Sequence, residues 1–240
     1  MQSPAVILDL SDVEIVQLSR TDFQAFDIGA SGDVIKRLYK AYGALWEHSG
    51  DPAMPHVQLT SGKHSNQYFN SAKLAFRAPL GEFLARQFLG LFELATEDVV
   101  IGPSYGANFL AADLATVFGC NRAYTERDTG KEQTWTGRWA VPVGGKVQLC
   151  EDVISTGGST LKTKRAVQSA SVESVRFHDR VACLVNRSGL DELEDGTAIV
   201  ALLRFAVEAW VPHDCPLCKA GSVLVGDVKK NWARLTGTTE

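Results

Sequence analysis

Short apolar runs alternate with amphipathic segments along most of the chain. Three runs, at 99–101, 146–152 and 180–186, are rich in valine, isoleucine and leucine and are bounded by turn residues, as buried strands are. The other expected strands are 120–125 and 198–205, and the expected helices are 80–94, 108–118 and 161–170. Strands that alternate with helices predict an α/β fold, in which a central parallel sheet is flanked by helices and the site lies at the carboxyl ends of the strands.

The two ends of the chain are patterned differently. Residues 1–31 are predicted to form an acidic, weakly patterned N-terminal extension. Asp33 is predicted to cap an amphipathic helix whose apolar face ends at Leu45. Paired extended segments are expected over 56–76, around a Ser-Gly turn, and a polar loop over 126–145. The expected divisions are the extension 1–31, an N-terminal helix and hood at 32–78, an α/β core at 79–212 and a C-terminal segment at 213–240.

The most specific signal lies in residues 147–160. An apolar strand ends in two adjacent carboxylates, Glu151 and Asp152, and a loop of hydroxyl residues and glycines at 155–160 then opens a helix. Glycine lets backbone N–H groups converge on a phosphate, and the helix N-terminus adds favourable potential. The two carboxylates are placed to accept hydrogen bonds from vicinal sugar hydroxyls. These features predict a sugar-phosphate site; the alternative is an ordinary turn whose Ser or Thr caps the helix.

Composition and charge exclude several classes of protein and of binding partner. With 45% apolar residues, a formal net charge of −4 and a pI of about 5.8, the chain is typical of a soluble globular protein that binds neither nucleic acid nor anionic membranes. It has no apolar run near the roughly 20 residues of a membrane span, and no secretory signal. Its five cysteines, an odd number, suit a reducing cytosol, so a cytoplasmic location is expected. Neither a Walker A loop nor a Gly-x-Gly-x-x-Gly fingerprint is present.

The segment 147–160 resembles the signature with which type I phosphoribosyltransferases bind 5-phosphoribosyl-1-diphosphate (PRPP). The resemblance implies the fold of that family, a Rossmann-like central parallel sheet with a small hood from the N-terminal region and the C-terminal segment. It implies that Glu151 and Asp152 hold the ribose, and that Mg²⁺ is bound through PRPP near Asp152 without a dedicated metal site. The implied 5′-phosphate ligands are Ser155, Thr156, Gly157, Gly158, Ser159 and Thr160.

Transfer from PRPP also requires a place for the diphosphate. The turn 102–107, Gly-Pro-Ser-Tyr-Gly-Ala, follows the strand 99–101 and offers backbone amides that glycine leaves accessible. By itself it is a commonplace turn between strand and helix. Beside the PRPP loop it becomes the expected diphosphate site, with Ser104, Tyr105 and Gly106 as ligands.

The segment 56–70 resembles the hood of orotate phosphoribosyltransferases, in which a Leu-x-Ser-Gly-x-x-Ser turn precedes aromatic residues that cover the base. Tyr68 and Phe69 stand at these positions, and both suit the core of the hood equally well. Arg187 stands where that family has an arginine facing orotate, whose carboxylate a guanidinium binds in a fork. A surface arginine at a strand end is the alternative. Ser155 stands where that family has a Thr or Ser near the base.

The segment Cys215-Pro-Leu-Cys218 is similar to that of a branch of bacterial and archaeal orotate enzymes. Taken alone, Cys-x-x-Cys indicates half of a zinc site or a redox pair. No second such pair and no nearby pair of histidines completes a tetrahedral set along the sequence, although His213 is available as a third ligand. A structural turn is the favoured interpretation.

Three departures from the orotate pattern concern lysines. Many orotate enzymes have a lysine where this chain has Thr60, another where it has Gly106, and a Lys-Asp-His-Gly sequence in a mobile loop that is absent here. The corresponding loop lies within 124–139. In the family this loop reaches into the partner subunit, which implies a homodimer. The cations expected to close over the diphosphate as a lid are Arg127, Lys131 and Arg138.

The favoured function is orotate phosphoribosyltransferase: displacement at ribose C1 of PRPP by orotate, with departure of diphosphate through an oxocarbenium-like transition state. Two alternatives stay open, a transferase for another nucleobase and a PRPP-binding regulator without turnover. The expected catalytic residues are Glu151, Asp152, Arg127, Lys131 and Arg138.

Overall fold

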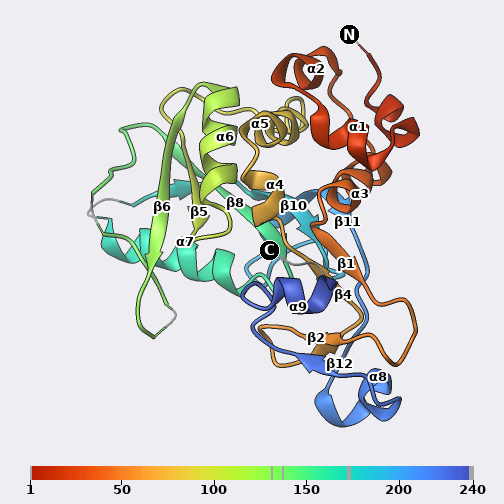
Figure 1. Ribbon diagram of the computed structural model, residues 1–240. Helices are drawn as coiled ribbons and strands as arrows, with labels where there is room; N and C mark the ends of the chain where they lie inside the picture. Colours follow the sequence, from red (N-terminus) through yellow and green to blue (C-terminus); the bar gives the residue numbers. More distant parts are fainter. Residues whose placement is uncertain (1, 131, 137, 172–173, 238–240) are drawn as a thin grey trace.

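A mostly parallel sheet forms the centre of the molecule in the computed structural model, which describes residues 2–130, 132–136, 138–171 and 174–237 (Figure 1). Its strands are β5 (Val99–Pro103), β6 (Asn121–Arg127), β7 (Gln133–Thr134), β8 (Lys146–Ile154), β9 (Arg176–Phe177), β10 (Arg180–Asn186) and β11 (Ala198–Arg204). Across the sheet the order is β11-β10-β8-β5-β6-β7, and β9 pairs with the start of β8. All pairings are parallel except that of β7 with β6. The expected fold class is confirmed.

Helices cover both faces of this sheet. The helices α3 (Gly32–Ala41), α4 (Ala72–Ala75), α5 (Ala78–Arg86) and α6 (Asn108–Phe118) contribute to one hydrophobic core, and α7 (Gly158–Ala170) contributes to another. Side chains of β10 alternate between the two cores, because successive residues of a strand point to opposite faces. Ala182 and Leu184 belong to the core of α3, α5 and α6, whereas Val181 and Cys183 belong to that of α7.

The strand order reverses between β5 and β8. The chain leaves β5 through α6 to reach β6 on one side, and it leaves β8 through α7 to reach β10 on the other. The carboxyl ends of the two strands lie at the same edge of the sheet, because the strands are parallel neighbours. Ligands of open α/β sheets bind outside such a point, so the segments after Pro103 and Ile154 are where a site is expected.

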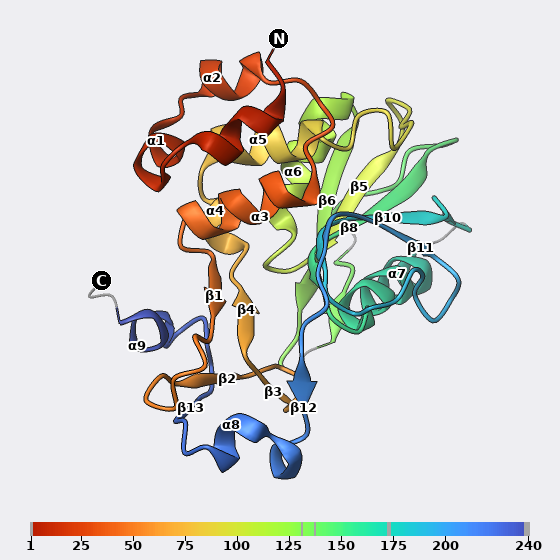
Figure 2. The same ribbon diagram turned by 90° about the vertical axis from the view of Figure 1, so that its right-hand side faces the viewer.

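The hood consists of two small sheets built from both ends of the chain (Figure 2). One pairs β1 (Leu45–Glu47) with β4 (Gln67–Phe69). The other has the order β12-β3-β2-β13, from β12 (Ala209–Trp210), β3 (His64–Ser65), β2 (His56–Gln58) and β13 (Leu224–Val225). The C-terminal segment also forms η2 (Pro212–Asp214), α8 (Pro216–Lys219) and α9 (Trp232–Thr236). The hood has its own apolar core, formed by Trp46, Val57, Leu59, Val225, Val228, Trp232 and Leu235.

The N-terminal segment is more regular than its sequence indicated. It forms η1 (Pro4–Asp9), α1 (Asp12–Gln17) and α2 (Arg20–Ala25). Both α-helices begin with a capping box, in which a serine and the acidic residue three positions later bond each other's backbone amides. The buried side chains Ile7, Ile15, Phe23 and Phe26 belong to the core of α3, α5 and α6.

Several expected boundaries were wrong for local reasons. The helix expected over 80–94 ends at Arg86, and the chain turns there through Gly90, whose φ is +81°. Ser31, not Asp33, caps α3, which stops at Ala41 before a turn at Gly43 with φ +56°. Leu45 therefore belongs to β1. The loop expected over 126–145 contains β7, which makes a hairpin with β6.

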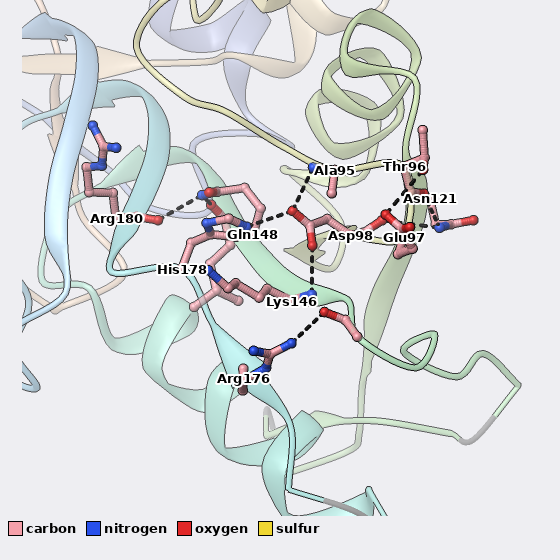
Figure 3. Close-up of polar contacts among 12 residues, drawn as sticks. Ala95, Thr96, Glu97, Asp98, Asn121, Lys146, Gln148, Arg176, His178 and Arg180 are labelled. Atoms are coloured by element: carbon pink, nitrogen blue, oxygen red, sulfur yellow. Dashed lines mark hydrogen bonds and ion pairs between the residues drawn. The ribbon is translucent and has the colours of Figure 1, made fainter.

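A polar network fastens the amino ends of the central strands, at the edge of the sheet opposite the expected site (Figure 3). The buried Asp98 carboxylate accepts hydrogen bonds from the backbone N–H groups of Ala95 (3.0 Å) and Lys146 (2.7 Å). His178 Nε2 lies 2.9 Å from the same carboxylate. The contacts join the start of β5, the start of β8 and the segment before β10. In the described parts of the chain no helix is long and apolar enough to cross a membrane.

Candidate functional site

The two adjacent acids at the end of β8 lie in different environments. Glu151 is 5% exposed, whereas Asp152 points to the opposite face and is half-buried. The Glu151 carboxylate accepts hydrogen bonds from the hydroxyls of Ser159 (2.6 Å) and Thr160 (3.0 Å) in the first turn of α7. Strand β8 and helix α7 are therefore joined by the site residues themselves.

Burial determines the ionisation of the first acid. Loss of solvation raises the pKa of Glu151 well above its ordinary value, the neighbouring Asp152 raises it further, and the Ser159 hydroxyl opposes both. Burial and the neighbouring acid therefore both act against the charge on Glu151. The pair presents one shielded acid and one accessible carboxylate, an arrangement that hydroxyl donors or a cation of a ligand would stabilise.

The loop 155–160 has the geometry of an anion site. Gly157 has φ +75°, a backbone conformation that favours glycine. A Cβ there would also lie 2.4 Å from Leu193 Cδ2, so any larger residue would have to displace that side chain. Ser155 and Thr156 are exposed, and α7 begins at Gly158. A helix N-terminus with accessible hydroxyls favours phosphate.

Thr160 differs from the expected phosphate ligands. Its side chain is fully buried, and its hydroxyl donates to Glu151. It holds the acid in place, and because it is fully buried its side chain does not line the open side of the loop. The Ser159 hydroxyl also bonds Glu151, but Ser159 is exposed.

The turn after β5 contacts the second acid. A Cβ built on Gly106 would lie 2.5 Å from Asp152 Oδ2 and 2.7 Å from its Cγ, so the Asp152 carboxylate lies directly against this backbone. The expected diphosphate turn and the expected ribose acid are thus side by side. Tyr105 is 78% exposed, and the Ser104 Oγ is buried and has no hydrogen-bond partner in the described part of the chain. The peptide bond between Ser104 and Tyr105 is cis.

Arg187 lies beside the same acid. Its backbone N–H donates to Ile154 O at 2.9 Å, which fixes the end of β10 against the end of β8. Its side chain is largely buried, and among the described residues no group bonds its Nε or Nη1. Burial lowers the pKa of Arg187, and nearby Tyr68 and Asp152 oppose that shift. Buried guanidinium groups normally have partners, so the two unpaired nitrogens of Arg187 are a feature that the proposed function has to explain.

The two hood aromatics have different surroundings. Phe69 is 4% exposed and packs between Tyr39 and Phe205, with ring centroids 5.3 and 5.4 Å away, so it belongs to the main core. Tyr68 is half-buried and lies 6.0 Å from Trp232, ring to ring. Burial raises the pKa of Tyr68, although the nearby Arg187 guanidinium lowers it. Tyr68 therefore lies at the site and Phe69 beneath it.

The expected lid segment is partly a hairpin. In β6 and β7, Glu126 lies opposite Thr134 and Arg127 opposite Gln133. Arg127 and Arg138 are exposed, and Arg138 Nη1 lies 3.3 Å from Glu126 Oε1. Lys131 lies outside the described residues. The tryptophans that follow the hairpin, Trp135 and Trp139, pack with the core of α7.

Comparison with known proteins identifies the family of this chain. A family model described as a phosphoribosyl transferase domain matches residues 81–202. The chain belongs to the phosphoribosyltransferase family. It is 36% identical over 169 residues to the orotate phosphoribosyltransferase of Heliobacterium modesticaldum, covering 70% of this chain and 85% of that protein. It is 35% identical over 193 residues to the orotate phosphoribosyltransferase of Caldicellulosiruptor bescii, covering 80% and 95%.

A solved structure supports the fold. The orotate phosphoribosyltransferase of Aeropyrum pernix is similar to this phosphoribosyltransferase with a TM-score of 0.55 and 24% identity, over 72% of this chain and 93% of that chain.

Sequence reasoning missed several features of this phosphoribosyltransferase. The packing of Trp232 against Tyr68 joins residues from the two ends of the chain, and no local pattern signals it. The contact between Gly106 and Asp152 is also non-local. The glycine in place of the family's lysine at 106 could have indicated it, because a side chain there would collide with the acid. The bond from Thr160 to Glu151 could have been inferred from the first-turn position of Thr160.

Proposed function

We propose that this protein is an orotate phosphoribosyltransferase, which transfers the phosphoribosyl group of PRPP to orotate and gives orotidine 5′-phosphate and diphosphate. The observation that carries the proposal is the buried Arg187 guanidinium, whose Nε and Nη1 have no partner among the described residues, beside Tyr68 and Asp152. A planar carboxylate such as that of orotate fits this fork. The similarity to orotate phosphoribosyltransferases over most of the chain supports the same substrate.

In this proposal PRPP lies across the carboxyl ends of β5 and β8. The 5′-phosphate binds the backbone of 155–160 and the exposed hydroxyls of Ser155, Thr156 and Ser159, while Thr160 positions Glu151. Asp152 and Glu151 accept the ribose hydroxyls. The diphosphate binds the turn that contains Ser104, Tyr105 and Gly106, which already lies against Asp152.

The reaction is a displacement at ribose C1. The bond from C1 to the diphosphate oxygen breaks with its electron pair, and the orotate nitrogen forms the new bond to C1. Positive charge develops on the ribose in the transition state, and the Asp152 carboxylate lies where it stabilises that charge. Arg187 and Tyr68 hold the base in line, so the protein contributes mainly orientation and electrostatics.

The donor set at the site fits Mg²⁺ bound with the substrate. Mg²⁺ takes oxygen ligands and is usually held by one or two carboxylates together with substrate phosphates and waters. The half-buried Asp152 carboxylate beside the Gly106 turn is such a ligand. When bound, the ion would neutralise charge on the departing diphosphate.

We further propose that Arg127, Lys131 and Arg138 close over the diphosphate as a lid contributed to the partner subunit of a homodimer. Support comes from the exposure of Arg127, at the end of the β6–β7 hairpin, and of Arg138, which follows the hairpin. The weak pairing of exposed Arg138 with Glu126 is easily exchanged for a phosphate. The five cysteines are free, which supports a reducing, cytosolic location.

A second candidate is a transferase for another nucleobase, and the absence of lysines at Thr60 and Gly106 favours it. The two candidate functions predict different roles for Arg187. It binds the carboxylate of the base in an orotate transferase, and it has no carboxylate to bind if the base lacks one.

The deciding experiment follows the absorbance of orotate after mixing with protein, PRPP and Mg²⁺. Wild type is expected to consume orotate, and a Glu151→Gln, Asp152→Asn double variant is expected to be inactive. In Arg187→Lys the KM for orotate should rise about 10–100-fold, with a smaller change in the KM for PRPP, because a bidentate contact becomes a point charge.

The outcomes separate the hypotheses. If the protein turns over a base without a carboxylate, and Arg187→Lys leaves that rate unchanged, that base and not orotate is the substrate. Binding of PRPP by wild type without diphosphate release for any base would leave a regulator that has lost turnover.

A further inference from the structure

Two histidines of the hood and two cysteines of the C-terminal segment lie together, at the end of the molecule where Figure 2 shows β2, β3 and α8. His56 begins β2, His64 begins β3, and Cys215 and Cys218 belong to the cap and first turn of α8. One candidate ligand atom from each of the four lies within 4.8 Å of every other. His56, His64 and Cys215 are buried, and Cys218 is exposed.

The distances within this cluster are those of ligands around one small cation. His56 Nε2 lies 3.3 Å from His64 Nδ1, and Cys218 Sγ lies 3.3 Å from each of these nitrogens. A tetrahedral ion with bonds of about 2.0 Å to nitrogen and about 2.3 Å to sulfur separates its ligands by about 3.3–3.8 Å. The Cys218 thiol proton and a proton on His64 Nδ1 would give at most two well-aligned hydrogen bonds among these three atoms, whereas one cation is bound by all three.

A neighbouring serine fixes the orientation and the tautomer of His56. The Ser222 hydroxyl donates its only proton to Met54 O at 2.6 Å. At 2.9 Å from His56 Nδ1 it must therefore accept, so that nitrogen carries the ring proton. The lone pair of the neutral ring is then on Nε2, which faces His64 and Cys218. Zinc-binding histidines are characteristically held by such an outer hydrogen bond.

The cysteine pair has the local geometry of a metal-binding turn. The backbone N–H of Cys218 donates to Cys215 Sγ at 3.5 Å, a contact that stabilises a thiolate. Both cysteines are free. His213, the ligand expected from the sequence, is 79% exposed and pairs with Asp214, outside the cluster. The histidine pair that the sequence did not offer near the cysteines comes from the other end of the chain.

We propose that His56, His64, Cys215 and Cys218 bind a structural Zn²⁺ ion. Two thiolates and two imidazoles in tetrahedral reach select zinc over the oxygen-seeking Mg²⁺ and Ca²⁺. Four protein ligands close the coordination sphere, so the ion holds structure and does not activate water. It fastens the β2–β3 hairpin to the C-terminal segment. The inference rests on the hood alone and is independent of the proposed transferase activity.

The test measures metal in untagged protein purified from zinc-supplemented medium. Elemental analysis is expected to find one zinc ion per chain in wild type and a small fraction of that in Cys218→Ser, whose side chain is exposed and so perturbs packing little. The matched controls Cys120→Ser and His213→Asn alter a thiol and an imidazole outside the cluster and should keep the full content. Wild type without zinc, or Cys218→Ser with as much zinc as wild type, overturns the proposal.

Replacement by Co²⁺ gives a second readout that does not depend on any variant folding. Wild type is expected to show the thiolate-to-cobalt charge-transfer band and the intense visible bands of tetrahedral Co²⁺, and stoichiometric Zn²⁺ should abolish both. Octahedral Co²⁺ spectra, or no thiolate band, would exclude the Cys₂His₂ site. Loss of orotate turnover with these spectra intact would contradict only the transferase proposal.

Discussion

The absence of a side chain at Gly106 determines where the Asp152 carboxylate can lie. A Cβ there would lie 2.5 Å from Asp152 Oδ2, closer than such atoms approach in proteins, and the carboxylate and its Cγ would have to move. The glycine thus lets the acid lie against the turn 102–107. The lysine that many orotate enzymes carry at this position is incompatible with this placement of Asp152, so the departure and the contact explain each other.

Gly106→Ala is therefore expected to reduce kcat/KM for the proposed transfer about 100-fold, because a displacement of roughly 1 Å in a positioned group costs that much. Stability should change little, since the Asp152 carboxylate can swing aside. The measurements are steady-state kinetics and thermal unfolding.

The matched control is Gly32→Ala in α3, where a Cβ would meet only Leu203 Cδ1 at an ordinary 3.5 Å. Equal activity of Gly106→Ala and Gly32→Ala would show that the Asp152 position does not matter for transfer.

At the scale of elements, the hydrogen bonds around Asp98 connect the amino ends of the central strands. Burial acts to raise the pKa of Asp98, but the backbone amides of Lys146 and Ala95 and the ring of His178 outweigh it, so the pKa lies below its ordinary value. The carboxylate is thus ionised and links β5, β8 and the segment before β10.

Asp98→Ala is expected to lower the free energy of unfolding by about 2–4 kcal/mol, because it removes a buried carboxylate that accepts hydrogen bonds from two backbone amides. A carboxyl whose pKa is depressed on folding stabilises above its unfolded pKa, and the contribution is lost as the pH falls through the folded pKa. The difference from wild type should therefore be constant above about pH 5 and shrink only below about pH 3.9.

Denaturant unfolding as a function of pH measures both quantities. Asp179→Ala, at an exposed position one residue beyond His178, should change stability by less than about 0.5 kcal/mol. A difference between Asp98→Ala and wild type that vanished near neutral pH would mean that His178, not the carboxylate, controls the network.

The central elements and the β2–β3 hairpin around the Ser-Gly turn were predictable, whereas the rest of the hood was not, for physical reasons. Strands such as β10 are buried on both faces, so their sequences are continuous apolar runs that need no tertiary information to recognise. The strands β12 and β13 have two residues each and are held by partners from distant parts of the chain. No periodicity can develop over two residues, so their pairing follows from the fold and not from local pattern.

The same contrast holds at the site. The acids and the loop 155–160 were evident because one continuous segment carries them. The environment of Arg187 depends on Tyr68 and Asp152, which lie far from it in sequence, so its lack of a partner could not be foreseen. For Phe69 the sequence left two interpretations open, and packing against Tyr39 and Phe205 decides for the core.

At the scale of the whole molecule, the N-terminal segment is an integral layer of the core. Phe23 packs 5.3 Å from Phe83 of α5, ring to ring, and Phe26 lies 6.1 Å from the same ring. The Arg86 guanidinium donates to the backbone carbonyls of Phe23 and Phe26 at the end of α2. Buried aromatic contacts and donated hydrogen bonds together bind this segment to α5.

Phe23→Ala should consequently lower the free energy of unfolding of the whole protein by about 3–5 kcal/mol, the usual cost of removing a buried aromatic ring. Denaturation followed by both fluorescence and circular dichroism should give one coincident transition at a lower midpoint. Val13→Ala in α1, at a 63% exposed position, is the control and should stay within about 0.5 kcal/mol. An unchanged main transition preceded by a separate early one would show that the segment folds as an appendage.

The pairing of β2 with both β3 and β13 has a consequence for the order of synthesis. The ribosome makes His56–Gln58 long before Leu224–Val225, so the hairpin must wait without one of its neighbours while the entire α/β core emerges. Strands 99–204 can assemble first, since their contacts are complete among themselves and the segments before them. The contact between Tyr68 and Trp232 can form only when Trp232 has left the exit tunnel. A nascent chain can therefore form the loop 155–160 early, whereas the surroundings of Tyr68 are complete only in the finished polypeptide.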